Sequence, residues 1–93
     1  MSNRTWIVDV VVMPKPGVND PEGEAILGGL RSLGYSEVER VRSGKTIQLE
    51  IAAANEDVAR ERASQMAERL LANPVVEVFE VVVAGPSIEE AAR

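Results

Sequence analysis

The fold is decided by residues 36–51, which read Ser36-Glu37-Val38-Glu39-Arg40-Val41-Arg42-Ser43-Gly44-Lys45-Thr46-Ile47-Gln48-Leu49-Glu50-Ile51. From Thr46 to Ile51, polar and apolar residues alternate strictly, which predicts a strand with one buried and one wet face. A less regular run from Tyr35 to Val41 predicts another strand. The polar residues between these runs then predict a hairpin turn, in which Gly44 takes a positive φ and Lys45 stays in solvent.

The same turn contains Ser43-Gly44-Lys45-Thr46, which looks like the end of a phosphate-binding loop. Such a loop needs a glycine five positions before the glycine of Gly-Lys-Thr, and a helix whose N-terminus faces the phosphate. Position 39 is Glu, and Thr46 begins the predicted strand. The spacing therefore favours a plain turn over a nucleotide site.

Two further strands are predicted at the ends of the chain, over Thr5–Met13 and Val75–Val83, where Val and Ile are frequent. In both, each of the two alternating sets of side chains is largely apolar, so we expect both faces of these strands to be covered. A second copy of the chain is the simplest cover, because exposed apolar patches of that size are unusual on a monomer. The residues that we expect to take part in self-association are Trp6, Val8, Val10, Val12, Val76 and Val78.

Two helices are predicted between the strands. The first begins after Asp20, which can cap the first free amides of the helix, and Pro21 suits its first position. Gly34 ends it. Gly28-Gly29 inside it indicates either a weak helix middle or close packing against a strand or another subunit, and both explanations stay open. The second helix begins after Asn55 and ends before Pro74. Its expected buried stripe is formed by Ala59, Ala63, Met66 and Leu70, widened by Ala67 and Leu71.

The resulting order is strand, helix, strand, strand, helix, strand, which is that of an α+β, ferredoxin-like split βαβ sandwich. We expect an antiparallel sheet with both helices on one face, dimerising through its strands or its open face. Residues 1–84 form the predicted domain, and 85–93 a tail that is a short helix or disordered.

Composition excludes several classes of function. The net charge is −5 and there are only three aromatic residues, which argues against nucleic-acid binding. Cysteine and histidine are absent, so disulfides, thiolate or histidine metal sites and the usual nucleophile–base pairs are excluded. No apolar run approaches the roughly 20 residues of a membrane span, and no signal peptide is evident. We expect a cytoplasmic protein without catalytic residues, a metal site or a cofactor of its own.

Two features of the sequence can be explained either by a function or by a structural role. Asp9, flanked by valines, is either a perturbed carboxylate with a role or an acid that pairs with a nearby Arg, and we favour the second. The proline-rich loop from Pro14 to Gly23 is either a rigid crossover into the helix or a docking loop, because rigid loops lose less entropy on binding.

Four blocks of sequence carry a specific resemblance and occur in order between Trp6 and Val83. They are Met13-Pro14-Lys15-Pro16-Gly17-Val18-Asn19-Asp20-Pro21-Glu22-Gly23, Leu30-Arg31-Ser32-Leu33-Gly34-Tyr35, Val41-Arg42-Ser43-Gly44-Lys45 and Leu70-Leu71-Ala72-Asn73-Pro74-Val75-Val76-Glu77. Together they resemble the PurS family, the small subunits of phosphoribosylformylglycinamidine (FGAM) synthase. The tail from Ala84 onward is longer than the resemblance to the family leads us to expect.

The resemblance implies a subunit without catalysis of its own, within an ATP- and glutamine-dependent C–N ligase of purine (IMP) biosynthesis. Its implied partners are a large synthetase subunit (PurL type), which binds ATP, Mg and formylglycinamide ribonucleotide (FGAR), and a glutaminase subunit (PurQ type). The subunit would bridge these two and support ammonia transfer between them. The family forms homodimers or dimers of dimers. The residues that we expect to dock on partners are Arg42, Gly44, Lys45, Asn19 and Asp20.

Two other functions share the predicted order of strands and helices. The first is a small-molecule-binding regulatory module of the amino-acid-binding (ACT-like) kind, for which the only argument is fold analogy. The second is an acylphosphatase-like enzyme, which needs a placed Arg and Asn in an anion-cradling loop. The loop after the first strand offers Lys15 and Asn19 but no Arg.

Overall fold

A computed structural model describes residues 3–86 and shows an α+β fold, as predicted. Its elements, in chain order, are β1 (Arg4–Pro14), α1 (Pro21–Ser32), β2 (Lys45–Ala53), α2 (Glu56–Met66), the π-helical turn η1 (Ala67–Leu71) and β3 (Glu77–Pro86). β3 continues two residues past the expected domain boundary at position 84, and the rest of the expected tail lies outside the described residues.

The sheet of the described chain is antiparallel, and its strand order is β2-β1-β3. Asp9 at the centre of β1 stands opposite Gln48 of β2 and Val82 of β3. A register shift between Ile7 and Val8 marks a bulge against β3. Because side chains alternate across a strand, this register puts the even-numbered residues of β1 on one face and the odd-numbered ones on the other.

The core lies between the sheet and α2. Val8, Val10 and Val12 of β1 are 0% exposed and form one cluster with the buried alanines of α2 and η1, Ala59, Ala63 and Ala67. The alanines recur every four residues and therefore form one small-residue ridge, which lets α2 approach the valines closely. The expected stripe was wrong at Met66 and Leu70, which are 37% and 83% exposed. The ridge continues through position 67 instead.

Helix ends follow the predicted capping. The Asp20 side chain accepts from the backbone N–H of Gly23, and the Asn55 side chain accepts from that of Val58. At the end of α1, Gly34 has φ +100° and donates to the carbonyl of Arg31, and Tyr35 donates to that of Leu30. This pair of bonds is a Schellman motif, which needs a left-handed residue at the position of Gly34.

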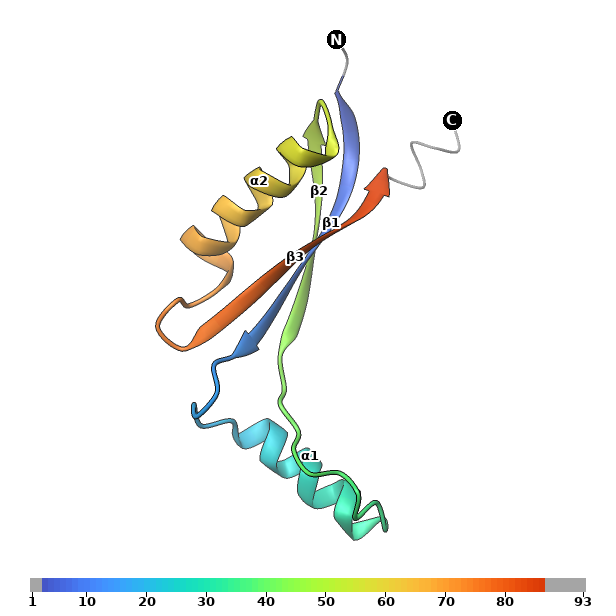
Figure 1. The fold of residues 1–93 in the computed structure, drawn as a ribbon, viewed down its shortest axis with the longest axis vertical. Helices are drawn as coiled ribbons and strands as arrows, with labels where there is room; N and C mark the ends of the chain where they lie inside the picture. Colours follow the sequence, from blue (N-terminus) through green and yellow to red (C-terminus); the bar gives the residue numbers. More distant parts are fainter. Residues whose placement is uncertain (1–2, 87–93) are drawn as a thin grey trace.

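The expected strand over Tyr35–Val41 is not formed, and α1 does not lie beside α2 on the sheet. Within residues 3–86, only α2 packs across all three strands, while α1 lies beyond the end of the sheet (Figure 1). The segment from position 33 to 43 runs back along α1, to which it is tied by an Arg31 side-chain bond to the Val38 carbonyl. A strand needs a pairing edge, and this segment lies beside a helix instead. We call residues 15–43 the α1 arm.

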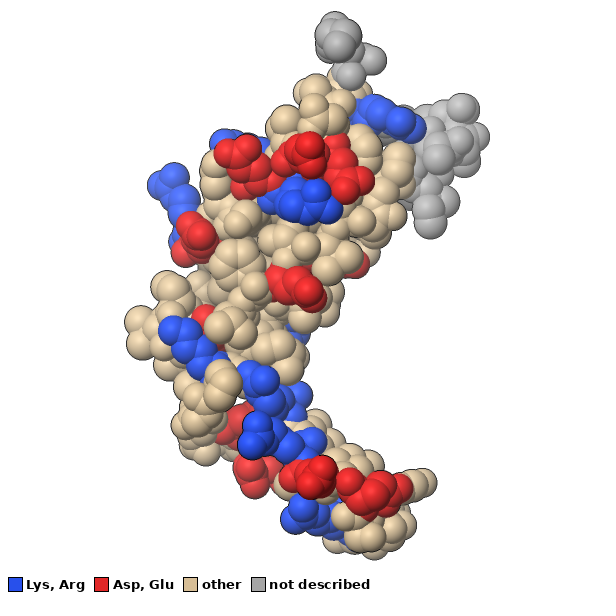
Figure 2. Space-filling model, viewed as in Figure 1, with Lys and Arg blue, Asp and Glu red and all other residues tan. Residues whose placement is uncertain are grey.

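The arm makes the molecule long. Its radius of gyration is 17.1 Å and its extents are 55 × 32 × 15 Å. A globular domain of this length has a radius of gyration of about 12 Å. Figure 2 shows the arm curving away from the sheet and α2, which together we call the body. The chain therefore presents more surface than a self-contained domain of its size.

Candidate functional site

A cleft of about 350 Å³ lies where the arm joins the body. Its walls are two segments, residues 14–20 and 40–42, together with Glu24 of α1. Lys and Arg side chains gather at this junction in Figure 2, although the protein as a whole is acidic. The cleft therefore concentrates positive charge on a chain of net charge −5.

Asp20 ties the two walls together. One oxygen of its carboxylate accepts from the backbone N–H of Gly23 at 3.0 Å, and the other accepts from the backbone N–H of Ser43 at 2.8 Å. These two bonds hold the pKa of Asp20 below its ordinary value, and the bond from Ser43 has the larger effect. The positive charge of Arg42 lowers the pKa of Asp20 further. Asp20 thus caps α1 and also joins it to the start of β2.

Gly23 makes this junction possible because a side chain would not fit there. It is buried, and a Cβ atom on it would meet the Asp20 carboxylate and would lie 2.6 Å from the carbonyl oxygen of Val41. A second link beside it joins the Ser43 hydroxyl, as donor, to the carboxylate of Glu22. The arm is therefore fixed to the point where β2 begins.

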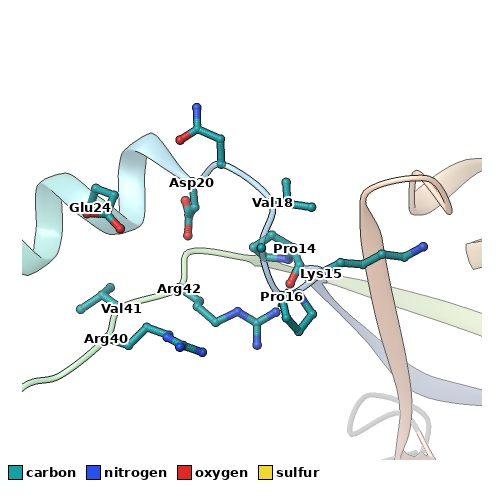
Figure 3. Close-up of a pocket in the computed structure, with 11 residues that line it drawn as sticks. Pro14, Lys15, Pro16, Val18, Asp20, Glu24, Arg40, Val41 and Arg42 are labelled. Carbon is teal, nitrogen blue, oxygen red and sulfur yellow. Dashed lines mark hydrogen bonds between the residues drawn. The ribbon is translucent and has the colours of Figure 1, made fainter.

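Two arginines reach into the cleft from the second wall. Arg42 donates from Nη2 to the carbonyl of Pro14, which links the two walls again. In Figure 3, the guanidinium of Arg40 extends in the same direction, toward the side on which Pro16 lies. Lys15 lines the cleft but its side chain extends away from the arginines toward β3 (Figure 3). Two guanidinium groups therefore share one space.

The five predicted docking residues are distributed over this junction. Asn19 and Asp20 lie in the first wall, and Arg42 in the second. Gly44 does not have the expected positive φ, and it lies in no hairpin turn because the preceding strand is missing. A Cβ on Gly44 would collide with the Met13 sulfur and the Val12 carbonyl, so glycine is needed there for close approach to β1. Lys45 begins β2 and is exposed.

Three of the predicted self-association residues do not face solvent. Val8, Val10 and Val12 are buried under α2 within a single chain, and Trp6, half-buried, donates from its indole N–H to the Ala53 carbonyl at 3.0 Å. Val76 lies in the turn before β3, and Val78 is exposed on the open face of the sheet. The prediction selected the wrong alternating set of β1, because both sets are apolar and only the position of α2 tells them apart.

Asp9 has a structural partner, which is not the expected arginine. Its carboxylate accepts from the side-chain amide of Gln48, directly across the strand pair, at 3.1 Å. Among residues 3–86, no three His, Cys, Asp or Glu side chains are grouped so that they could hold a metal ion. No helix in the described part of the chain is long and apolar enough to cross a membrane.

Comparison with known proteins identifies the family. The PurS family model, described as phosphoribosylformylglycinamidine (FGAM) synthase, matches residues 7–85. The chain belongs to the PurS family. The PurS subunit of Archaeoglobus fulgidus is 42% identical over 76 residues, which cover 82% of this chain and 95% of that protein. The family and the function predicted from the sequence, a subunit of FGAM synthase in purine biosynthesis, are confirmed, and the ACT-like alternative is not favoured.

Solved PurS structures have the same fold. The PurS subunit of Thermotoga maritima superimposes with a TM-score of 0.81 at 36% identity, covering 89% of this chain and 95% of that one. A chain of the PurLQS structure from T. maritima matches with a TM-score of 0.77 at 38% identity, covering 85% of this chain and 96% of that one. Each superposition covers nearly the whole length of the matched chain, so it includes both the sheet and α1.

Sequence reasoning missed Arg40. It lies two residues before Arg42, and in an extended segment residues i and i+2 point to the same side. That spacing could have placed both guanidinium groups together on one side of the segment, as Figure 3 shows. The cleft itself could not be found, since its first wall comes from residues twenty or more positions earlier in the chain.

Proposed function

We propose that this chain is the non-catalytic small subunit that joins a large synthetase subunit of the PurL type to a glutaminase subunit of the PurQ type. The observation that supports this most strongly is its match to the PurS chain within the PurLQS assembly of T. maritima. In this proposal the chain holds the two active sites in register, so that ammonia passes between them instead of escaping to water. ATP and Mg²⁺ belong to the large subunit. A cytoplasmic location stays a prediction.

The partners dock at the junction of arm and body. Asn19 and Lys45 supply exposed polar contacts, and Arg42 adds positive charge. Asp20 and Gly44 act indirectly in this proposal. They set the position of the loop and of the first residue of β2, through the two Asp20 hydrogen bonds and through the close approach of Gly44 to β1.

We also propose a homodimer in which a second copy covers the open face of the sheet. The described apolar side chains on that face are Ile7, Val11, Met13, Val78 and Val82, of which Val78 and Val82 are 46% and 43% exposed. The supporting argument is that a monomer rarely leaves such a stripe uncovered. Pairing of two dimers into a tetramer is compatible with the same proposal.

Sedimentation of two matched variants tests the dimer. Val82→Glu places a charge on the open face, and Val58→Glu places one on the outer side of α2, at a residue of similar exposure (41%). We expect wild type and Val58→Glu to sediment as dimers at micromolar concentration and Val82→Glu as a monomer. A monomeric wild type, or dissociation by Val58→Glu instead, would contradict this arrangement.

Reconstitution tests the subunit function. The synthetase and glutaminase subunits are assayed with and without this chain, once with glutamine and once with free ammonium as the nitrogen source. We expect the chain to raise glutamine-dependent formation of FGAM strongly and ammonium-dependent formation little, because free ammonia does not need to be passed between subunits. Equal glutamine-dependent rates with and without the chain would refute the proposal.

A further inference from the structure

The two arginines of the cleft have hydrogen-bonding capacity that the described chain does not use. A guanidinium group carries five N–H donors. Arg42 directs a donor to the carbonyl of Pro14, and within residues 3–86 the Arg40 side chain makes no hydrogen bond or ion pair. Both groups extend toward the same space beside Pro16 (Figure 3). That space is therefore lined with free, charged donors.

The acidic side chains near the cleft do not satisfy these donors. The oxygens of Asp20 accept from the backbone N–H groups of Gly23 and Ser43, and Glu22 accepts from the Ser43 hydroxyl. Glu24, the other carboxylate of the lining, forms no ion pair with either arginine in the described chain. The arginines are therefore available to an acid from outside the chain.

The remaining lining suits an extended peptide. Pro14, Pro16, Val18 and Val41 supply apolar surface for side-chain stems, and proline fixes the backbone of the first wall. The walls are also tied together by Arg42 and by Asp20, so little ordering is needed when a ligand binds. A preformed cleft with apolar walls and two guanidinium groups favours one planar, singly charged carboxylate.

The charge balance separates a carboxylate from a phosphate. The lining has three cations, Lys15, Arg40 and Arg42, and two carboxylates, Asp20 and Glu24. Because the Lys15 side chain extends away from the arginines, two guanidinium groups and two carboxylates share the cleft. A doubly charged phosphate would be repelled by Asp20 and Glu24 more strongly than a singly charged carboxylate. The N-terminus of α1, which could otherwise attract phosphate, is already capped by Asp20.

We propose that this cleft binds an Asp or Glu side chain on an extended segment of a partner subunit, through Arg40 and Arg42. The identity of the partner rests on the function proposed above. Arg40 supplies the main contact because it has no bond within the described chain. Arg42 supplies a second set of donors while its bond to Pro14 keeps its guanidinium in place.

Affinity measurements on the full-length chain test this proposal. Calorimetric titration of the synthetase and glutaminase subunits is performed with wild type, Arg40→Glu, Arg40→Lys and the control Arg62→Glu, which makes the same charge change on the exposed outer side of α2. We expect Arg40→Glu to weaken one partner by about 10-fold or more, with Arg62→Glu within about 3-fold of wild type. Arg40→Lys should fall between them, because Lys cannot form the two parallel bonds.

Each other result overturns the proposal in a distinguishable way. Wild-type affinity in Arg40→Glu would remove the cleft from docking but leave the subunit function standing, since the complex still forms. Equal losses in Arg40→Glu and Arg62→Glu would indicate general charge effects only. Tighter binding of inorganic pyrophosphate than of a hexaglutamate peptide to the isolated chain would make this a phosphate site. Failure of wild type to bind either subunit would refute the proposed function itself.

Discussion

The body and the α1 arm bury very different amounts of side chain. All buried hydrophobic residues of the described chain lie outside the arm, in the body (β1, β2 and α2) or in η1 and the turn that follows it. In α1, all of it described, the one buried residue is Gly23, and at the end of the arm Leu33 and Tyr35 are 75% and 51% exposed. The body is held by packing, whereas the arm is held by hydrogen bonds at its base.

This difference indicates what each part does. Burial of apolar surface is the main term that stabilises a fold, so the body has the means to fold within one chain. The arm gains little from burial and is fixed through Asp20, Ser43 and Arg42 at its junction with the body. An element held in this way exposes its apolar side chains, which is the arrangement expected of a segment that packs against another subunit.

The largest expected contrast comes from one substitution made in both helices. Ala63→Asp places a charge under α2, where the side chain is 0% exposed, and we expect it to lower the free energy of unfolding by about 3 kcal/mol or more. Ala25→Asp changes an exposed position of α1 and should cost no more than about 0.7 kcal/mol. Urea denaturation measures both. Similar losses would mean that the arm is as tightly packed as the body.

Replacing glycines of α1 by alanine should have opposite effects on stability at the start and in the middle of the helix. Gly23→Ala should destabilise the chain by about 1–3 kcal/mol, because the new methyl group overlaps the Asp20 carboxylate and the Val41 carbonyl. Gly28→Ala should stabilise it by about 0.5–1 kcal/mol, because no described atom outside the neighbouring helix backbone lies within 4 Å of the new methyl group.

Binding measurements on Gly28→Ala then decide between the two explanations for the Gly28-Gly29 pair. A stabilised variant that still binds its partner subunits supports a merely weak helix middle. A stabilised variant that no longer binds supports close packing against a partner. Destabilisation by Gly28→Ala would show that α1 is packed already within the isolated chain.

Acid should loosen the base of the arm through Asp20. Its pKa is lower in the folded protein than in the unfolded chain, chiefly because of the bond from the Ser43 N–H. The resulting stabilisation is therefore present above the unfolded pKa of about 4 and is lost as pH falls through the lower folded value. Asp20→Asn should have a lower free energy of unfolding than wild type at pH 7, and this difference in stability should become smaller toward pH 2. A difference in stability that does not change with pH would exclude a stabilising role for the charge of the Asp20 carboxylate.

The smallest effect is expected at the end of the arm. Leu33→Ala removes an exposed side chain and should change the free energy of unfolding by less than about 0.5 kcal/mol. Val12→Ala deletes fewer atoms but in the core, and we expect a loss of about 2 kcal/mol. Thermal unfolding of both variants gives the ranking. An equal or larger loss at Leu33 would contradict the division into a packed body and an exposed arm.

Local chemistry was predictable from the sequence. The caps at Asp20 and Asn55 and the stop at Gly34 depend on bonds between neighbours, and all three were predicted correctly. β1, β2 and β3 were also expected, because β-branched runs favour extended backbone. These features need no information about distant parts of the chain.

Features that depend on distant contacts were not predictable. The segment over Tyr35–Val41 has strand composition, but Asp20 and Arg31 tie it and its continuation to α1 and not to a sheet edge. The choice between the two apolar faces of β1 likewise depends on where α2 packs. At the site, Asp20 and Arg42 were identified as candidates, while Arg40 entered only once the two walls of the cleft were seen together.

Hydrogen exchange of the chain, alone and mixed with the synthetase and glutaminase subunits, tests the division of roles most directly. We expect the central amides of β1 and β2 to be protected in both samples. The amides of α1 and of residues 38–42 should exchange quickly in the free chain and slow markedly in the complex. Protection gained only on α2, or no change in the arm on complex formation, would contradict the assignment of docking to the arm.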